Sequence, residues 1–140
     1  MKLLSAALLA IVFSAGAALA GEAVGTWLSS DGGTKVRISN CGGKLCGTVV
    51  WLDDPNDNAG KPKTDVLNPD PAKRARPLLG LQVVQGLTPS GPNRWSGLIY
   101  NADDGKTYQA HMMVPQTNSA KVQGCVLGLL CKTENWTRTN

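Results

Sequence analysis

Hydrophobic and polar residues alternate with a period of two in short runs along most of the chain after its first twenty residues. Such alternation is typical of β-strands with one buried face, and β-branched and aromatic residues are frequent in these runs. Helical periodicity is nearly absent, so the chain is predicted to be all-β. The expected strands cover residues 24–28, 34–39, 45–52, 80–86, 94–100, 106–114, 120–124 and 134–138.

Glycine-rich turns separate several of these runs. The best marked are Asp31-Gly32-Gly33, Cys41-Gly42-Gly43-Lys44 and Asp103-Asp104-Gly105. They supply glycine where a tight hairpin needs positive φ, so they indicate antiparallel neighbours. Eight short strands in meander order close most economically into a small up-and-down barrel, because closure removes the exposed edges of an open sheet. A β-sandwich is the alternative.

One long connection, residues 53–79, lacks alternation and holds five of the eight prolines. Loops of this length in a compact domain are usually functional or disordered. Its segment 70–75 begins with an N-cap aspartate followed by a proline, which predicts one short helical turn. We expect the loop to be ordered against one end of the barrel through Leu67, Leu78 and Leu79.

The first twenty residues follow the three-part pattern of a secretory signal. Lys2 precedes an apolar run over residues 3–13, and small residues lead up to Ala20. The apolar run is too short for the ~20 residues of a spanning helix, so a membrane anchor is the less favoured interpretation. We expect cleavage after Ala20, a single domain over residues 21–140, a periplasmic or secreted location and no membrane span.

The amino-acid composition and the distribution of charge limit the kinds of partner that the protein is expected to bind. A chain with 42% hydrophobic and 17% charged residues is an ordinary globular domain. Of its 14 Lys and Arg residues, Lys2 leaves with the signal, so 13 basic residues face 10 acidic ones. The basic residues are scattered rather than gathered on one face, and a nucleic-acid partner is therefore not expected.

The four cysteines are an even number in a short exported chain, which is typical of a disulfide framework. They are Cys41, Cys46, Cys125 and Cys131. Each neighbouring pair brackets a segment with glycine, so local bridges 41–46 and 125–131 are favoured among the three connectivities. A four-thiolate zinc site is the rival interpretation, disfavoured by the spacing and by export.

Few residues are suited to catalysis. The one histidine, His111, lies on the strand face opposite Tyr108, and the chain has no Gly-x-Ser-x-Gly motif. The aspartates of the 53–79 loop could form an acid–base pair or, together with Asn56 and Asn58, hold calcium. Aspartate in such loops is more often a turn former. We expect no cofactor and no metal, and a hydrolase that uses loop carboxylates is only a second alternative.

Several short motifs stand out in the mature chain. They are residues 60–65 (GKPKTD), 68–71 (NPDP), 76–81 (RPLLGL), 94–97 (RWSG), 104–108 (DGKTY), 124–128 (GCVLG) and 136–138 (WTR). Together they resemble the bacterial exported family called domain of unknown function 2147. The resemblance implies export and a compact β fold, and it supplies no catalytic residue because the family has no established activity.

A second similarity concerns the two ends of the mature chain. Gly25-Thr26-Trp27 on the first strand, with Arg138 on the last, is similar to the lipocalin pairing in which a terminal arginine covers a tryptophan at the barrel base. This similarity implies that the first and last strands are neighbours. It places the Arg138 guanidinium within about 6 Å of the Trp27 ring, as a cation–π contact requires.

Two modes of binding follow from these features. In the favoured one the barrel is filled, and the polar loop with the apolar corner 126–130 contacts another envelope protein or a glycan. The candidate binding residues are Lys63, Asp65, Asp70, Arg74, Arg76 and Tyr108. In the alternative, the barrel is a lipocalin-like carrier of a small apolar ligand. The interior volume separates the two, because a drug-sized ligand has no room below ~300 Å³.

Overall fold

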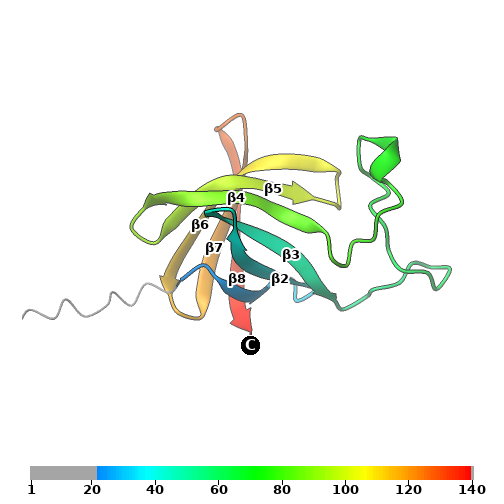
Figure 1. Ribbon diagram of the computed structural model, residues 1–140, viewed down its shortest axis with the longest axis horizontal. Coiled ribbons are helices and arrows are strands. Elements are labelled where there is room, and N and C mark those ends of the chain that lie inside the picture. Colours follow the sequence, from blue (N-terminus) through cyan, green and yellow to red (C-terminus); the bar gives the residue numbers. More distant parts are fainter. Residues whose placement is uncertain (1–21, 140) are drawn as a thin grey trace, which may run out of the picture.

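A computed structural model describes residues 22–139, and the predicted signal peptide and its cleavage site lie outside them. Eight antiparallel strands close into a barrel, each paired with its neighbours in the sequence and the last with the first. Figure 1 shows them wrapped around one interior. This confirms the up-and-down barrel and excludes the sandwich. The strands are β1 (Gly25–Leu28), β2 (Thr34–Cys41), β3 (Lys44–Leu52), β4 (Gln82–Gly91), β5 (Arg94–Asn101), β6 (Lys106–Gln116), β7 (Ser119–Val126) and β8 (Leu130–Thr139).

All eight predicted strands are present, and most run further than the alternation indicates. The two largest extensions are at the end of β4, which runs to Gly91 instead of residue 86, and at the start of β8, which begins at Leu130 instead of residue 134. The first residues of β8 pair with the end of β7, with Cys131 opposite Cys125. The pattern missed them because Lys132 faces the barrel interior, where a simple amphipathic strand would carry an apolar side chain.

The long connection, residues 53–81, is called the strap here because it lies outside the barrel and returns to it, at the right of Figure 1. It contains the predicted helical turn as the 3₁₀ helix η1 (Pro71–Lys73), with the Asp70 side chain accepting from the Ala72 N–H. Isolated bridges join Asn56 to Pro62 and Thr64 to Pro77. Within residues 22–139 no helix is long and apolar enough to cross a bilayer.

The two ends of the barrel differ in construction. The closed end carries the β2–β3, β4–β5 and β6–β7 turns and both ends of the described chain, and the open end carries the other turns and the strap. Apolar side chains fill the interior towards the closed end. Trp27, Ile38, Leu87 and Val114 are almost completely buried there and form the centre of the core.

Arg138 seals the closed end. Its guanidinium carbon lies 4.3 Å from the centre of the Trp27 ring, and its N–H groups donate to the carbonyls of Glu22, Val24 and Thr117. A side chain at Gly25, whose φ is +142°, would collide with that guanidinium. The predicted Arg138–Trp27 contact and the pairing of β1 with β8 are thus confirmed.

Both predicted disulfides are formed. Cys41–Cys46 closes the β2–β3 hairpin at the closed end, and Cys125–Cys131 clamps the β7–β8 hairpin at the open end. Because all four thiols are oxidised, the four-thiolate zinc interpretation is wrong.

Candidate functional site: an open cavity in the barrel

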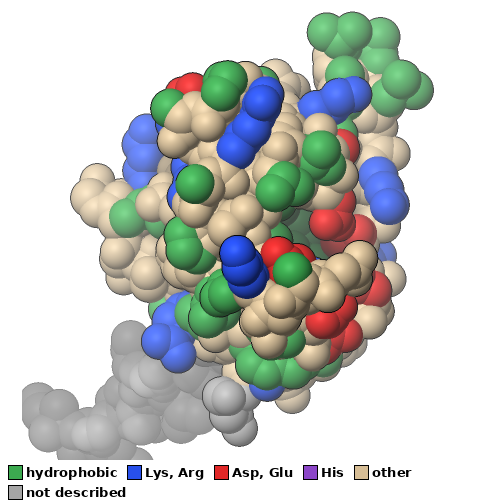
Figure 2. All heavy atoms as spheres, turned by 90° about the vertical axis from the view of Figure 1, so that its right-hand side faces the viewer, with side chains coloured by type: hydrophobic (Ala, Val, Ile, Leu, Met, Phe, Trp, Pro, Cys, Tyr) green, Lys and Arg blue, Asp and Glu red, His purple; other side chains and the backbone are tan. Residues whose placement is uncertain are grey.

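The barrel interior is not filled towards the open end. A cavity of about 680 Å³ extends inwards from that end, more than twice the ~300 Å³ that a drug-sized ligand needs. Figure 2 looks onto this face, where a hollow with hydrophobic side chains at its floor lies beside acidic groups. The space exists because half of the lining residues are glycine, alanine or branched aliphatics, and the sequence has no phenylalanine besides Phe13. The apolar lining includes Val36, Val49, Leu81, Val83, Ile99, Val122 and Trp136.

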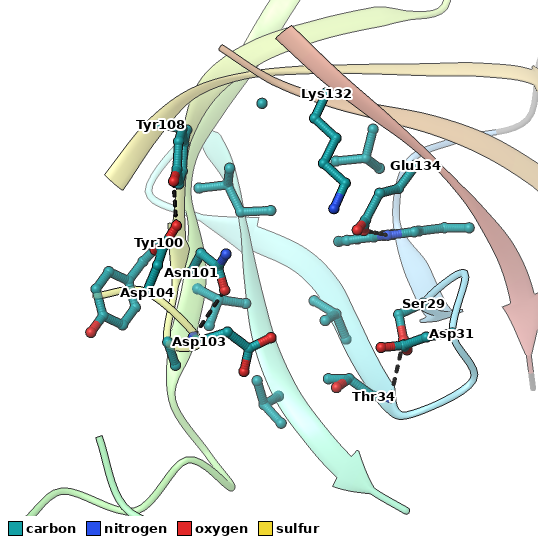
Figure 3. A pocket seen from close by; sticks show the side chains of 18 of the residues that line it. Ser29, Asp31, Thr34, Tyr100, Asn101, Asp103, Asp104, Tyr108, Lys132 and Glu134 are labelled. Carbon is teal, nitrogen blue, oxygen red and sulfur yellow. Dashed lines mark hydrogen bonds between the residues drawn. The ribbon is translucent and has the colours of Figure 1, made fainter. Parts of the chain in front are cut away.

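The rim of the cavity is polar. The β1–β2 turn supplies Ser29, Asp31 and Thr34, the β5–β6 segment supplies Asn101, Asp103, Asp104 and Tyr108, and β8 supplies Lys132 and Glu134 (Figure 3). Four of the charged groups in the lining are acidic and one is basic. A ligand in this site would therefore place its apolar part inside the barrel and its polar part at the rim.

Lys132 and Glu134 lie on the inner face of β8, in line with Trp136, because alternate residues of a strand share a face. Figure 3 shows both side chains directed into the cavity, across from Asp103 and Asp104. The Glu134 carboxylate accepts a hydrogen bond of 3.3 Å from the Trp136 indole. Among the ion pairs of the described residues none involves Lys132. A ligand thus meets one cationic donor and one anionic acceptor beside an indole.

Hydrogen bonds keep two rim carboxylates ionised. The pKa of Asp31 is lowered by the Ser29 hydroxyl at 2.7 Å and by the Gly33 N–H at 2.8 Å. Burial works against ionisation of Asp104, but donation from the Tyr108 hydroxyl and from a backbone N–H outweighs it and lowers that pKa. The pKa of Tyr108 is raised, mainly by the same hydrogen bond. The rim is therefore negative at neutral pH.

A buried polar cluster fastens the strap to the barrel beside the cavity. The fully buried carboxylate of Asp65 accepts from the Tyr100 hydroxyl at 2.6 Å, the Asn68 amide at 2.8 Å and the Arg76 Nε at 2.9 Å. Desolvation raises the pKa of Asp65, but these three hydrogen bonds prevail and lower it. Burial and the Asp65 carboxylate raise the pKa of Tyr100. The cluster holds the strap in one position.

The strap is thus ordered against the barrel, but through different groups from those expected. Leu78 packs against the core, as predicted, and it also lines the cavity. Leu67 and Leu79 are about half exposed, so their predicted anchoring role is wrong. The polar Asp65 cluster takes that role, because a loop rich in proline and aspartate offers hydrogen-bonding groups rather than an apolar face.

The candidate binding residues of the strap have partners within the strap. Asp65 and Arg76 form the cluster, Arg74 donates to the Asn68 carbonyl, Asp70 caps η1, and Lys63 pairs with Asp54 at 3.2 Å. Of the six candidates only Tyr108 lines the cavity. A binding role for the other five stays a prediction. Four cavity residues that the sequence did not single out are Asp31, Asp103, Lys132 and Glu134.

The other residues that the sequence offered for catalysis or metal binding do not lie together. His111 is exposed on the outer face of the barrel, where its Nδ1 lies 3.0 Å from the Ser96 hydroxyl. The Asp57 carboxylate accepts from the backbone of its own turn, and Asp65 is occupied by its three donors. Over the described part of the chain, no three His, Cys, Asp or Glu side chains are grouped as metal ligands.

An eight-stranded antiparallel barrel with an arginine-sealed base and an open, apolar cavity is a lipocalin-like fold. The structure is similar to that of HP1028 from Helicobacter pylori, a protein described as belonging to the lipocalin family. The TM-score is 0.74 at 24% identity, over 86% of this chain and 84% of that one, and the likeness concerns the fold. The chain belongs to the family described as "Uncharacterized protein conserved in bacteria (DUF2147)", which matches residues 25–138. No curated protein matches it.

Proposed function

We propose that this protein is an exported carrier that binds a small amphipathic molecule in the open end of its barrel. The observation that carries the proposal is the cavity of about 680 Å³, apolar inside and charged at its rim. Concave, largely preformed apolar sites with a few convergent polar groups are what small-molecule binding requires. The interaction through a filled barrel and the strap, favoured by the sequence, has less support because the barrel is not filled.

The energetics of such a site follow from its lining. Each CH₂ group moved from water into the apolar interior contributes about 0.8 kcal/mol, so a short aliphatic chain supplies most of the affinity. The rim groups contribute less because they remain accessible to water, and they select the polar part of the ligand. We expect a ligand with one aliphatic or aromatic portion and one polar group.

A location outside the cytoplasm would suit a carrier role. Two disulfides favour an oxidising compartment, and membership of a bacterial family is compatible with the periplasm. An amphipathic molecule that crosses an aqueous compartment needs its apolar part shielded from water. A lipocalin-like barrel provides that shield.

Gly124 offers a direct test of the cavity. A Cβ there would make ordinary contacts of 3.5 Å with Tyr108 and 3.9 Å with Ile99, so a side chain can be added on the inner face of β7 without backbone strain. Gly124→Leu should reduce affinity for a fluorescent fatty-amine or fatty-acid probe at least tenfold. Gln123→Leu, the same residue on the adjacent outward position, is the matched control.

The natural ligand can be sought in parallel by native mass spectrometry of protein purified from its own host. A copurified mass that is present in the wild type and absent in Gly124→Leu would support the proposal. Equal probe binding by the wild type and both variants would contradict it, because the probe would then be bound outside the cavity.

A further inference from the structure

The β7–β8 turn presents an unusual group of exposed aliphatic side chains. Leu127, Leu129 and Leu130 are 88%, 86% and 76% exposed, and Val126 is partly exposed. In Figure 1 the turn stands above the barrel, and in Figure 2 hydrophobic side chains protrude from the top of the same face. Turn positions normally carry polar residues or glycine. We infer that this turn, called the leucine tip (residues 126–130), docks the protein on a lipid bilayer surface.

The leucine tip is built to hold its shape without packing against the barrel. Leu127 has a φ of +55°, a conformation that favours glycine or asparagine over a branched aliphatic residue. The Cys125–Cys131 disulfide lies directly below the turn, and the Leu129 N–H donates to the Val126 carbonyl at 3.2 Å. Because the β7–β8 pairing runs up to Val126 and Leu130 and this hydrogen bond spans the turn, only the few backbone groups at the very end of the hairpin would need polar partners at a bilayer surface.

The size and charge of the leucine tip favour a bilayer over a protein partner. Four aliphatic side chains on one turn bury roughly a few hundred Å², well below the ~800 Å² per partner of a stable protein interface. A dimer formed through the tips of two copies of this chain would likewise bury too little surface to be stable. Residues 123–133 contain a single charge, that of Lys132, so the leucine tip itself brings no acidic group to the lipid headgroups.

The position of the leucine tip connects it with the cavity. Val126 and Leu130 belong both to the tip and to the cavity lining. Insertion of the tip would therefore bring the open end of the barrel to the membrane surface, with Val126 and Leu130 bordering both the bilayer and the cavity. The link between the leucine tip and the cavity rests on the proposed function, since it assumes an amphipathic ligand. Docking of the tip on the bilayer does not.

The test is sedimentation of the mature protein with vesicles of phosphatidylglycerol and phosphatidylcholine in equal parts. Burial of one leucine side chain changes a partition constant about tenfold or more, so Leu127→Ser with Leu129→Ser should lower binding at least tenfold. The matched control is the double variant Val66→Ser with Leu79→Ser, which removes two exposed aliphatic residues from the strap. It should sediment like the wild type.

Three results would overturn the inference. They are a wild type that stays in solution, a control variant that loses as much binding as the tip variant, and a concentration-dependent dimer that only the tip variant loses. Probe binding in solution, without vesicles, separates this inference from the proposed function. The tip variant should bind the probe like the wild type, whereas Gly124→Leu should lose the probe and still sediment.

Discussion

The two ends of the barrel use the same residue types for opposite purposes. At the closed end a tryptophan, an arginine and a glycine meet so closely that Trp27 is completely buried and Arg138 donates only to the protein's own carbonyls. At the open end another inward tryptophan, Trp136, borders the cavity, and the cationic Lys132 faces that cavity without an ion pair among the described residues. The closed end is packed against its own side chains and carbonyls, whereas the open end directs polar side chains, several of them held by internal hydrogen bonds, towards a cavity that a ligand can enter.

This contrast separates groups that stabilise the fold from groups available for function. A side chain whose hydrogen bonds and faces are all used inside the protein has little left for another molecule. By that measure the Asp65 cluster belongs with the closed end, although it lies beside the cavity, because its carboxylate has three donors. The leucine tip and the cavity rim are the regions with unused surface.

The largest effect is expected at Trp27. Trp27→Ala removes a fully buried ring from the core and from beneath the guanidinium, and such truncations cost about 3–5 kcal/mol. Trp51→Ala is the matched control, because Trp51 lies on the exposed outer face under the Lys35 ammonium and should cost less than ~1 kcal/mol. Urea unfolding followed by circular dichroism measures both. Equal losses would mean that the closed end is not the main stabilising region.

The strap anchor should make stability dependent on acid. The pKa of Asp65 is lowered in the folded protein, so its contribution is present above the ordinary value of 3.8 and is lost as the pH falls through the lowered one. Asp65→Asn should cost about 2–3 kcal/mol at pH 7, since three buried donors lose a charged acceptor. The free energy of unfolding of this variant should also fall less steeply below about pH 4 than that of the wild type.

Thermal unfolding at a series of pH values measures this effect. Asp53→Asn, at an exposed strap position, is the control and should leave the curve unchanged. If Asp65→Asn retains the full acid sensitivity of the wild type, the loss of stability in acid comes from other carboxylates.

A smaller effect is expected at Arg138. A cation–π contact is worth ~0.5–2 kcal/mol, and its hydrogen bonds lie in a partly accessible site, so Arg138→Ala should cost about 1–3 kcal/mol. Arg94→Ala removes the same side chain from an exposed position and should change stability by less than ~0.5 kcal/mol. Arg138→Lys should recover only part of the loss, because an ammonium cannot donate to three separate carbonyls in this planar arrangement.

The fold could be predicted from the sequence because most of the features that define it are local or follow a simple pattern. Alternation indicated all eight strands, three glycine-rich turns indicated antiparallel neighbours, and the similarity of Gly25-Thr26-Trp27 with Arg138 to the lipocalin pairing implied that the first strand lies beside the last. The two disulfides followed from cysteines near one another in the sequence.

The cavity could not be predicted in the same way. Whether a barrel is filled depends on the summed volumes of inward side chains from eight strands, and residues such as Gly124 and Val122 carry no signal individually. Glu134 looked like an ordinary polar strand residue and Lys132 lay outside the predicted strands, until the register of β8 placed both on the inner face. The Asp65 cluster was missed for a related reason: Tyr100 lies 35 residues away in the sequence.

The smallest expected effect lies at the rim and concerns ligand charge. Lys132 and Glu134 face the same cavity, so neutralising either one should change affinity in opposite directions for probes of opposite charge. Lys132→Gln should weaken binding of an alkyl sulfate probe and strengthen that of an alkylammonium probe of the same chain length, and Glu134→Gln should do the reverse. Because both groups are accessible to water, each change should amount to only about two- to fivefold at low salt and should fade as salt screens it. Fluorescence titration with the two probes and a neutral alkyl alcohol measures the pattern, with the alcohol expected to be insensitive to either variant. If all three probes change in parallel, the side chains act through the shape of the cavity rather than through charge, and the open end would then select its ligand by size alone.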